Sequence, residues 1–202
     1  MDVDSTLITA EVIELIAEHA GTRAQVARIT EAAMRGELDF AASLKERVAT
    51  LAGLPESVFE QVLAQVEFSQ GAPELIKAAQ SAGWEVALVS GGFIEIVEPL
   101  ATTLGITRFR ANRLEAVDGL LTGRTVGPVI DAHAKAVALR EFAAELGLPL
   151  EDTVAIGDGA NDLEMMAIAG HSIAFNAKPV VRDRADFAID GRLDAAAPLL
   201  GL

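Results

Sequence analysis

The sequence predicts an α/β protein in which a parallel β-sheet core carries a small helical domain near its N-terminus. Three observations lead to this prediction. Residues 11–66 have a helical spacing of apolar residues and no strand-like run, whereas strands and helices alternate from Phe68 onward. The 202-residue chain is 51% hydrophobic but only 4% aromatic, so Ala, Val, Leu and Ile must fill the interior, as they do in α/β folds.

The helical stretch begins a few residues after the start of the chain. Apolar residues recur there at spacings of three and four, beginning with Val12, Leu15 and Ile16. Glycines divide the stretch into about four short helices, at Gly21, Gly36 and Gly53. We therefore predict a helical domain over residues 9–67, inserted into a core domain that consists of residues 1–8 and 68–202.

The remainder of the chain alternates between two kinds of segment. Four runs have the composition of buried strands: residues 84–90, 153–156, 172–175 and 187–189. Helical segments alternate with them: residues 73–81, 93–104, 134–146 and 162–169. Residues 112–127 differ, because the Asp118-Gly119 pair at their centre favours a β-hairpin over another strand–helix unit. In such a sheet the active site lies beyond the carboxyl ends of the strands.

Charge and composition narrow the function. A formal net charge of −14 opposes binding to nucleic acid or to an anionic membrane surface. The absence of cysteine excludes disulfides and thiolate metal sites. No apolar run approaches the roughly 20 residues that span a bilayer, and no basic-then-apolar signal opens the chain. We expect a soluble cytoplasmic protein, and the sequence leaves its oligomeric state open.

Two carboxylates stand at the end of the first predicted strand, in Asp2-Val3-Asp4-Ser5-Thr6. Residues two apart in an extended segment project to the same side, so both carboxylates can face one small volume. Such a pair suits acyl-phosphate chemistry, in which one carboxylate attacks phosphorus and the other exchanges protons with the leaving group and with water. The alternative is a turn or helix N-cap built from Asp4-Ser5-Thr6, and the motif alone does not decide between them.

Later strand ends carry further polar residues. Ser90-Gly91-Gly92-Phe93 offers a hydroxyl and backbone amides to a phosphate, although an ordinary glycine-rich turn explains this motif equally simply. Lys135 begins a predicted helix, where its ammonium could neutralise phosphate charge or could simply be solvated. The acidic loop Gly157–Asp162 favours a hard cation such as Mg²⁺, with an Asx-turn as the alternative.

Taken in chain order, these segments resemble the motifs of the haloacid dehalogenase-like phosphohydrolases. That family has an Asp-x-Asp-x-Thr strand, a Ser or Thr at a later strand end, a Lys, and a Gly-Asp-x-x-x-Asp loop. The helical insert resembles the cap of the phosphoserine phosphatase branch, to which further segments are similar: Thr30–Phe40, Ser43-Leu44 with Arg47, Val89–Phe93 and Gly157–Leu163. The resemblance implies a Rossmann-like core with a helical cap inserted after the first strand.

The resemblance also implies a role for each matching residue. Asp2 is the nucleophile and Asp4 the acid/base, while Mg²⁺ is held by Asp2, Asp158 and the backbone carbonyl of Asp4. The phosphate group contacts Ser90, Gly91 and Lys135. Asn161 lies beside the substrate, and Asp162 steadies the loop and Lys135. In the cap, the substrate ammonium meets Glu11, its carboxylate meets Arg47, and Met34 and Phe40 close the pocket. Without the family pattern, Glu11 and Arg47 read as an exposed helix face.

The implied function is Mg²⁺-dependent hydrolysis of O-phosphoserine through an aspartyl phosphate, the last step of serine biosynthesis. Two alternatives stay open: action on another small phosphate ester, including phosphate transfer, and a catalytically silent binding module. The second is motivated by the first strand, because only Met1 precedes Asp2 where about five residues are expected. We therefore expect the chain to be the C-terminal part of a longer one, whose preceding segment supplies an apolar strand.

Overall fold

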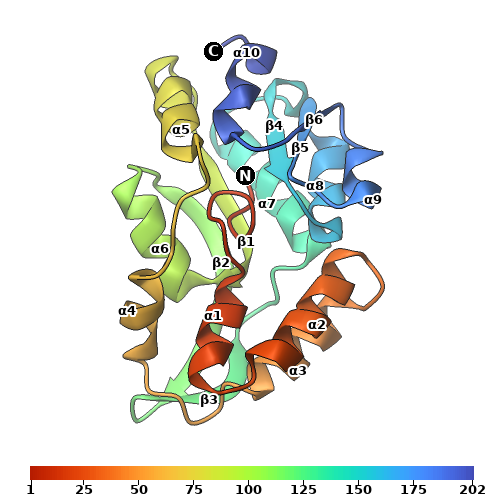
Figure 1. The fold of residues 1–202 in the computed structure, drawn as a ribbon. Helices are drawn as coiled ribbons and strands as arrows, with labels where there is room; N and C mark the ends of the chain where they lie inside the picture. The colour runs from red at the N-terminus through yellow and green to blue at the C-terminus, as the bar shows by residue number, and fades with distance from the viewer.

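The computed structural model describes all 202 residues. Four helices follow the first eleven residues and form a separate helical layer, at the bottom of the view in Figure 1. They are α1 (Val12–His19), α2 (Arg23–Met34), α3 (Phe40–Ala49) and α4 (Val58–Leu63). Helix α3 starts where Asp39 accepts a hydrogen bond from the backbone N–H of Ala42 at 2.8 Å, which satisfies one free donor of its first turn.

The core alternates strands and helices, which confirms the predicted α/β class. Its first half contains α5 (Ala72–Ser81), β1 (Ala87–Phe93), α6 (Ile94–Thr103), β2 (Arg108–Val117) and β3 (Leu120–Val126). Its second half contains α7 (Ala132–Glu145), β4 (Val154–Gly157), α8 (Leu163–Ile168), β5 (His171–Phe175), α9 (Pro179–Arg182), β6 (Phe187–Ile189) and α10 (Ala197–Leu200). Three short 3₁₀ turns join them, at Leu150–Asp152, Ala160–Asp162 and Leu193–Ala196.

The strands form two three-stranded sheets, ordered β1-β2-β3 and β4-β5-β6. Strand β2 runs parallel to β1 and antiparallel to β3, while β4, β5 and β6 are all parallel. The hairpin prediction was therefore correct but incomplete. Its first strand begins at Arg108, earlier than expected, and this extra part completes a β1-α6-β2 unit. The strand predicted at residues 84–90 is also shifted: it runs from Ala87 to Phe93 and leaves Trp84 outside the sheet and 40% exposed.

The first residues of the chain lie between the two sheets. The amino group of Met1 donates to the carbonyl of Ala87 at 2.8 Å, and the N–H of Val89 donates to the carbonyl of Met1 at 2.9 Å. On the other side, the N–H of Asp2 donates to the carbonyl of Ile156 at 2.9 Å. These bonds follow the pattern of a parallel ladder and join β1 to β4 through the N-terminal segment.

A mainly apolar cavity of about 510 Å³ is lined by Met1 and by residues of α5, β1, α7 and β4. It continues the line of the N-terminal segment between β1 and β4. The expectation that an apolar strand precedes Asp2 stays a prediction. None of the helices is long and apolar enough to cross a lipid bilayer.

One continuous hydrophobic core reaches from the sheet into the helical layer. It includes Leu88 and Phe93 of β1, Ile16 of α1 and Val48 of α3, each of which is at most 1% exposed. The β2–β3 hairpin also contacts the helical layer, because Leu121 exchanges backbone hydrogen bonds with Gly53 and Leu54, each of 2.8 Å. The helical layer is thus packed against the edge of the core at which β1 and β4 end.

Candidate active site

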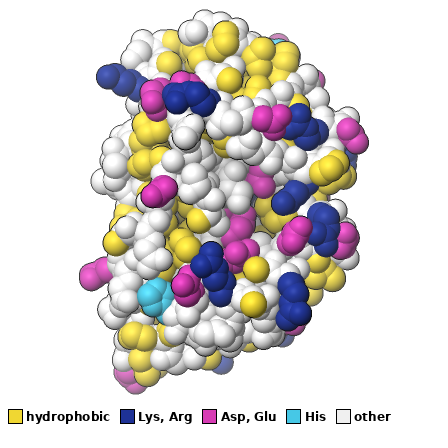
Figure 2. Space-filling model, viewed as in Figure 1, with side chains coloured by type: hydrophobic (Ala, Val, Ile, Leu, Met, Phe, Trp, Pro, Cys, Tyr) yellow, Lys and Arg dark blue, Asp and Glu magenta, His cyan; other side chains and the backbone are white.

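The predicted site residues of the core meet where the N-terminal segment, β1 and β4 reach their carboxyl ends. Figure 2 shows acidic side chains gathered in a hollow near the middle of this face, where the helical layer meets the core. The predicted site residues of the core are almost completely buried: Asp2, Asp4, Ser90, Lys135, Asp158, Asn161 and Asp162. The convergence follows from the parallel strand order, which brings segments far apart in the sequence to one edge.

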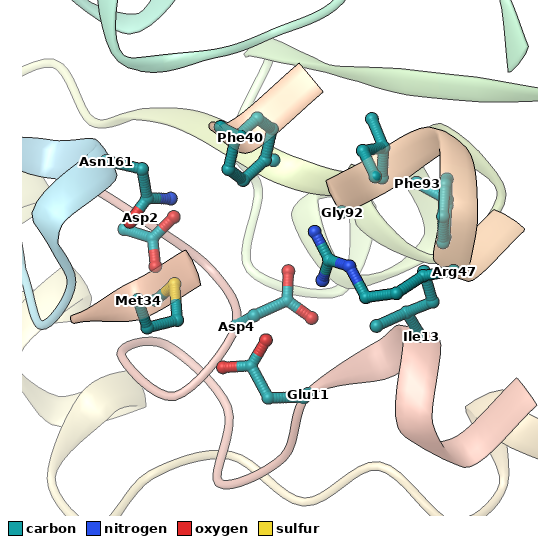
Figure 3. A pocket seen from close by; sticks show the side chains of 12 residues that line it. Asp2, Asp4, Glu11, Ile13, Met34, Phe40, Arg47, Gly92, Phe93 and Asn161 are labelled. Atoms are coloured by element: carbon teal, nitrogen blue, oxygen red, sulfur yellow. The ribbon is translucent and has the colours of Figure 1, made fainter. Parts of the chain in front are cut away.

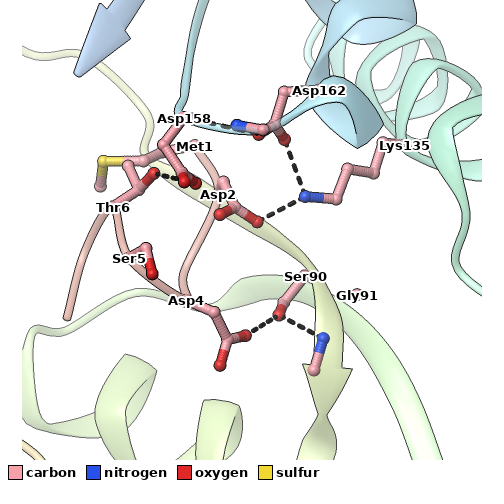
Figure 4. A network of polar contacts seen from close by, with 12 residues as sticks. Met1, Asp2, Asp4, Ser5, Thr6, Ser90, Gly91, Lys135, Asp158 and Asp162 are labelled. Atoms are coloured by element: carbon pink, nitrogen blue, oxygen red, sulfur yellow. Dashed lines mark hydrogen bonds and ion pairs between the residues drawn. The ribbon is translucent and has the colours of Figure 1, made fainter. Parts of the chain in front are cut away.

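Lys135 reaches into this cluster with its Nζ directed at Asp2 and Asp162 (Figure 4). It comes from the first turn of α7, and its Nζ donates to Oδ1 of Asp2 and, at 2.8 Å, to Oδ1 of Asp162. Burial alone would lower the pKa of Lys135, but the carboxylates of Asp162 and Asp2 outweigh burial and raise it. The lysine is therefore a fixed positive charge beside the carboxylates of Asp2 and Asp162.

Asp2 has one occupied oxygen and one free oxygen. Its Oδ1 accepts from Lys135, while its Oδ2 is buried and has no hydrogen-bond partner. Burial raises the pKa of Asp2 to about 7, and Lys135 only partly opposes this effect. A buried carboxylate oxygen without a partner is costly unless a ligand satisfies it. Oδ2 is thus the atom most available to an incoming electrophile or cation.

Three carboxylates lie close enough together to hold a divalent cation: oxygens of Asp2, Asp158 and Asp162 all lie within 4.8 Å of one another. Burial, followed by the charges of Asp2 and Asp162, raises the pKa of Asp158 well above its usual range. Asp162 already uses both oxygens, since Oδ1 accepts from Lys135 and Oδ2 accepts from the N–H groups of Asp158 and Gly159 at 3.2 Å. The oxygens of Asp2 and Asp158 therefore fit a hard cation better than those of Asp162 do.

Asp4 is held by two donors from different elements. Its Oδ1 accepts from the N–H of Val12, the first residue of α1, at 2.7 Å, and its Oδ2 accepts from the hydroxyl of Ser90 at 2.9 Å. Burial raises the pKa of Asp4, although these two hydrogen bonds lower it. Asp4 thus satisfies a donor at the start of α1 and also lines the pocket, while its catalytic role stays a prediction.

The Ser90 loop is held in place from two sides. The Ser90 hydroxyl accepts from the N–H of Gly92 at 2.8 Å while it donates to Asp4. Asn112 of β2 donates from Nδ2 to the carbonyl of Gly91 and accepts from the N–H of Ile130, both at 2.8 Å. Sequence analysis did not identify Asn112. In the sequence, Asn112 is one polar residue in a segment of mixed polarity, and nothing there distinguishes it from a solvent-exposed residue.

The helical layer completes a small pocket with a volume of about 30 Å³ (Figure 3). It brings together the predicted residues of both layers: Asp2, Asp4, Glu11, Met34, Phe40, Arg47, Gly91 and Asn161. Asn161 has a buried Oδ1 without a partner. The pocket is large enough only for about one or two water molecules, so a substrate must widen it to enter.

Arg47 and Glu11 bring opposite charges into this pocket. Arg47 is 4% exposed and makes no ion pair, and burial lowers its pKa although Glu11 and Asp4 act in the other direction. The guanidinium also lies 5.8 Å from the ring centroid of Phe40, within the range of a cation–π contact. Burial, followed by the charge of Asp4, raises the pKa of the Glu11 carboxyl to about 8. Neither residue lies on an exposed helix face.

Residues 1–167 match the family model of the haloacid dehalogenase-like hydrolases. The chain is 54% identical, over 202 residues, to phosphoserine phosphatase SerB2 of Mycobacterium tuberculosis. The alignment covers 100% of this chain but 49% of that protein. It is also 54% identical, over 189 residues, to phosphoserine phosphatase of Streptococcus thermophilus, covering 94% of this chain and 88% of that protein. The chain therefore spans about half of the first relative and most of the second.

Solved structures agree with these matches. One described as a phospho-aspartyl intermediate analogue of phosphoserine phosphatase superimposes with a TM-score of 0.96 at 42% identity, over 98% of this chain and 96% of the other. A substrate-bound phosphoserine phosphatase complex gives the same TM-score and identity, over 98% and 95% of the two chains. The chain belongs to the haloacid dehalogenase-like hydrolase family, and the relatives compared with it here are phosphoserine phosphatases.

Proposed function

We propose that this protein is a phosphatase that hydrolyses O-phosphoserine to serine and inorganic phosphate. The observation that carries the proposal is the position of Arg47, a buried guanidinium without a carboxylate partner, in one pocket with Glu11 and the Asp2–Asp4 pair. A guanidinium suits a carboxylate, and Glu11 suits an ammonium, so the pocket offers one partner for each charge of an amino-acid head group. The names of the relatives support the same substrate.

In the proposed reaction, Asp2 attacks phosphorus and Asp4 transfers the protons. The free Oδ2 of Asp2 forms a bond to phosphorus as the bond to the seryl oxygen breaks, which gives an aspartyl phosphate. Protonated Asp4 donates its proton to the departing seryl oxygen; the raised pKa of Asp4 supports this role. Asp4 then removes a proton from the water that hydrolyses the aspartyl phosphate and restores Asp2.

The phosphate group is expected to lie among the Ser90 hydroxyl, the N–H of Gly91 and the ammonium of Lys135. Ser90 contacts the carboxylate of Asp4, and Lys135 contacts that of Asp2. Lys135 would share its positive charge between Asp2 and the phosphoryl oxygens, which reduces their mutual repulsion. Asn161 lies at the edge of the same pocket with a free Oδ1, and Asp162 orients Lys135.

We propose Mg²⁺ as the cation, held by Asp2, Asp158 and the backbone carbonyl of Asp4. No hydrogen bond is made to the carbonyl of Asp4, so that oxygen is free to bind a cation. Mg²⁺ prefers one or two carboxylates together with substrate phosphate oxygens and water. When bound, it would neutralise charge on the phosphoryl group and help to orient it. The high negative charge of the protein then does not exclude an anionic substrate.

Residues 9–67 are proposed to act as a cap domain that opens and closes over a core of residues 1–8 and 68–202. Support comes from the pocket volume of about 30 Å³, which is too small for the substrate unless the helical layer moves. Met34 and Phe40 line the helical side of this pocket. The enzyme is proposed to work in the cytoplasm, on a small-molecule substrate, at the step that releases free serine in serine biosynthesis.

The proposal is tested by phosphate release from three related esters with Mg²⁺ present. O-phosphoethanolamine lacks the carboxylate of phosphoserine, and 3-phosphoglycerate has a hydroxyl in place of its ammonium. We expect phosphoserine to have the highest kcat/KM. Arg47→Ala should remove the preference over phosphoethanolamine, whereas Arg28→Ala, which changes an exposed arginine of α2 outside the ion pairs, should keep it. Equal turnover of all three esters by the unaltered protein would overturn the substrate assignment.

A further inference from the structure

Glu11 and Arg47 line the same small pocket but do not form an ion pair. None of the ion pairs in the protein joins these two side chains. Burial raises the pKa of Glu11 to about 8, but once Glu11 is ionised the two charges would attract strongly where water is excluded and would be expected to pair. Something in the structure must hold them apart.

Arg47 is held by polar groups of α2 and α3 that carry no charge. Its Nη1 donates to the hydroxyl of Thr30 on α2 at 3.0 Å, and its Nε donates to the carbonyl of Ser43, one turn earlier on α3, at 3.1 Å. Thr30 is 2% exposed, so water does not compete for this bond. Its Nη2 also donates to the hydroxyl of Ser43, at 3.5 Å. These acceptors fix the guanidinium, and one N–H of Nη1 and one of Nη2 are left for a ligand.

Glu11 is held by the hydroxyl of Ser5, which donates to its Oε1 at 2.6 Å. Ser5 has a φ of 57°, in the left-handed region that serine seldom adopts. The turn is closed by the N–H of Ser5, which donates to the carbonyl of Ala10 at 3.2 Å. The unusual backbone is thus part of the turn that brings the Ser5 hydroxyl to Glu11.

We infer that Ser5 and Thr30 are positioning residues that hold Glu11 and Arg47 apart, so that the pocket presents separate sites for an ammonium and a carboxylate. Each hydroxyl occupies one side of a charged group and leaves the opposite side free. Without them, Glu11 and Arg47 would turn towards each other and neutralise the two charges that a zwitterion needs. The inference rests on the proposed function for the identity of the ligand, but not for the geometry.

The test uses two variants that remove a hydroxyl with little change in shape, Thr30→Val and Ser5→Ala. Thr30→Val should lower the ratio of kcat/KM for phosphoserine to that for phosphoethanolamine about tenfold or more, the loss expected for a hydrogen bond to a charged group. The change should lie mainly in KM for phosphoserine, with kcat for phosphoethanolamine kept. Ser5→Ala should lower the ratio of kcat/KM for phosphoserine to kcat/KM for 3-phosphoglycerate in the same way. Thr30→Ser, which keeps the hydroxyl, should keep the wild-type ratio.

A folded Thr30→Val variant with the wild-type ratio would overturn the role of Thr30, and the same result with Ser5→Ala would overturn that of Ser5. If the wild-type protein itself does not prefer phosphoserine, the proposed substrate fails and the inference is judged by NMR. The ¹⁵N signals of the Arg47 guanidinium, assigned with Arg47→Lys, should show slow rotation of the Nη groups in the wild type and faster rotation in Thr30→Val. Unchanged rotation would contradict the inference whatever the substrate is.

Discussion

The ring of Phe40 lies over Gly91, so closely that a Cβ added to Gly91 would lie 2.6 Å from Cζ of the ring. Phe40 is the first residue of α3 in the helical layer, and Gly91 belongs to β1 beside Ser90. A carbon atom at that distance overlaps strongly with the ring. The helical layer therefore reaches this position on the core only because residue 91 is a glycine.

Gly91→Ala is expected to keep the cap from closing fully. Overpacking of this kind costs about 1–3 kcal/mol, which corresponds to a loss of roughly 5- to 150-fold in kcat/KM if closure is required for turnover. Steady-state phosphate release measures it. Phe40→Leu in the Gly91→Ala background removes the obstructing ring and should restore part of the loss, as a double-mutant cycle would show. Equal activity of Gly91→Ala and wild type would mean that closure does not limit the reaction.

Glu11→Gln is expected to change how stability depends on pH. Burial raises the pKa of Glu11 from 4.5 to about 8, so the folded protein binds this proton more tightly than the unfolded chain does. That contribution is fully present below pH 4.5 and is lost as pH rises through 8. Between about pH 5 and about pH 8.5, the free energy of unfolding of the wild type should fall by at least about 1.4 kcal/mol more than that of Glu11→Gln. This is the free energy that corresponds to a pKa difference of about one.

Urea unfolding of the metal-free proteins at the two pH values measures this difference. Glu46→Gln, which changes an exposed carboxylate on α3, is the matched control and should follow the wild type. The account of a desolvated Glu11 carboxyl is contradicted if Glu11→Gln and wild type lose stability in parallel.

Removal of divalent cations should abolish turnover, and Mg²⁺ should restore it. Calcium should inhibit, because it accepts more oxygen ligands in a looser geometry and would engage both oxygens of Asp2, including the one that attacks phosphorus. Phosphate release from chelator-treated protein, with Mg²⁺, Ca²⁺ or both, measures these effects. Asp158→Asn should need a higher Mg²⁺ concentration. Full activity in Ca²⁺ alone would argue against the site as described.

An apolar strand fused before Met1 is expected to stabilise the protein. The cavity of about 510 Å³ between β1 and β4 continues the ladder that Met1 and Asp2 begin, so a strand of about five residues can pair on both sides and bury its side chains. Burying two Val or Leu side chains should raise the melting temperature by at least about 5 °C. A Gly-Ser extension of equal length is the control. If both extensions give the same melting temperature, the cavity does not accept a strand.

The core of the site could be located from the sequence because it obeys one geometric rule. Ser90 and Asp158 each follow an apolar run that is long enough to be a strand, Asp2 and Asp4 alternate in one extended segment, and parallel strands bring their carboxyl ends together. Lys135 needed the family resemblance, since one lysine at a helix start has no pattern of its own. The roles of these residues remain predictions, while their proximity is a feature of the structure.

Residues that act through another side chain left no signal in the sequence. Asn112, Ser5 and Thr30 each bind a group that is distant in sequence or reached only through an unusual turn. Periodicity reports which face of an element is buried, not which hydroxyl or amide meets which partner on it. The start of β2 at Arg108 was missed for a related reason: its pairing with β1 is a tertiary contact, whereas the Asp118-Gly119 turn is local.

The central claim is that Asp2 carries the phosphoryl group during turnover, and acid-quenched reactions test it most directly. Phosphoserine labelled in its phosphate is mixed with the Mg²⁺-loaded protein, the reaction is stopped in acid, and the labelled peptide is identified by mass spectrometry. We predict a phosphoryl group on Asp2 in the wild type, none in folded Asp2→Asn, and turnover lowered roughly 10²–10⁴-fold in Asp4→Asn. Label on another residue, or substantial hydrolysis by Asp2→Asn, would contradict the account.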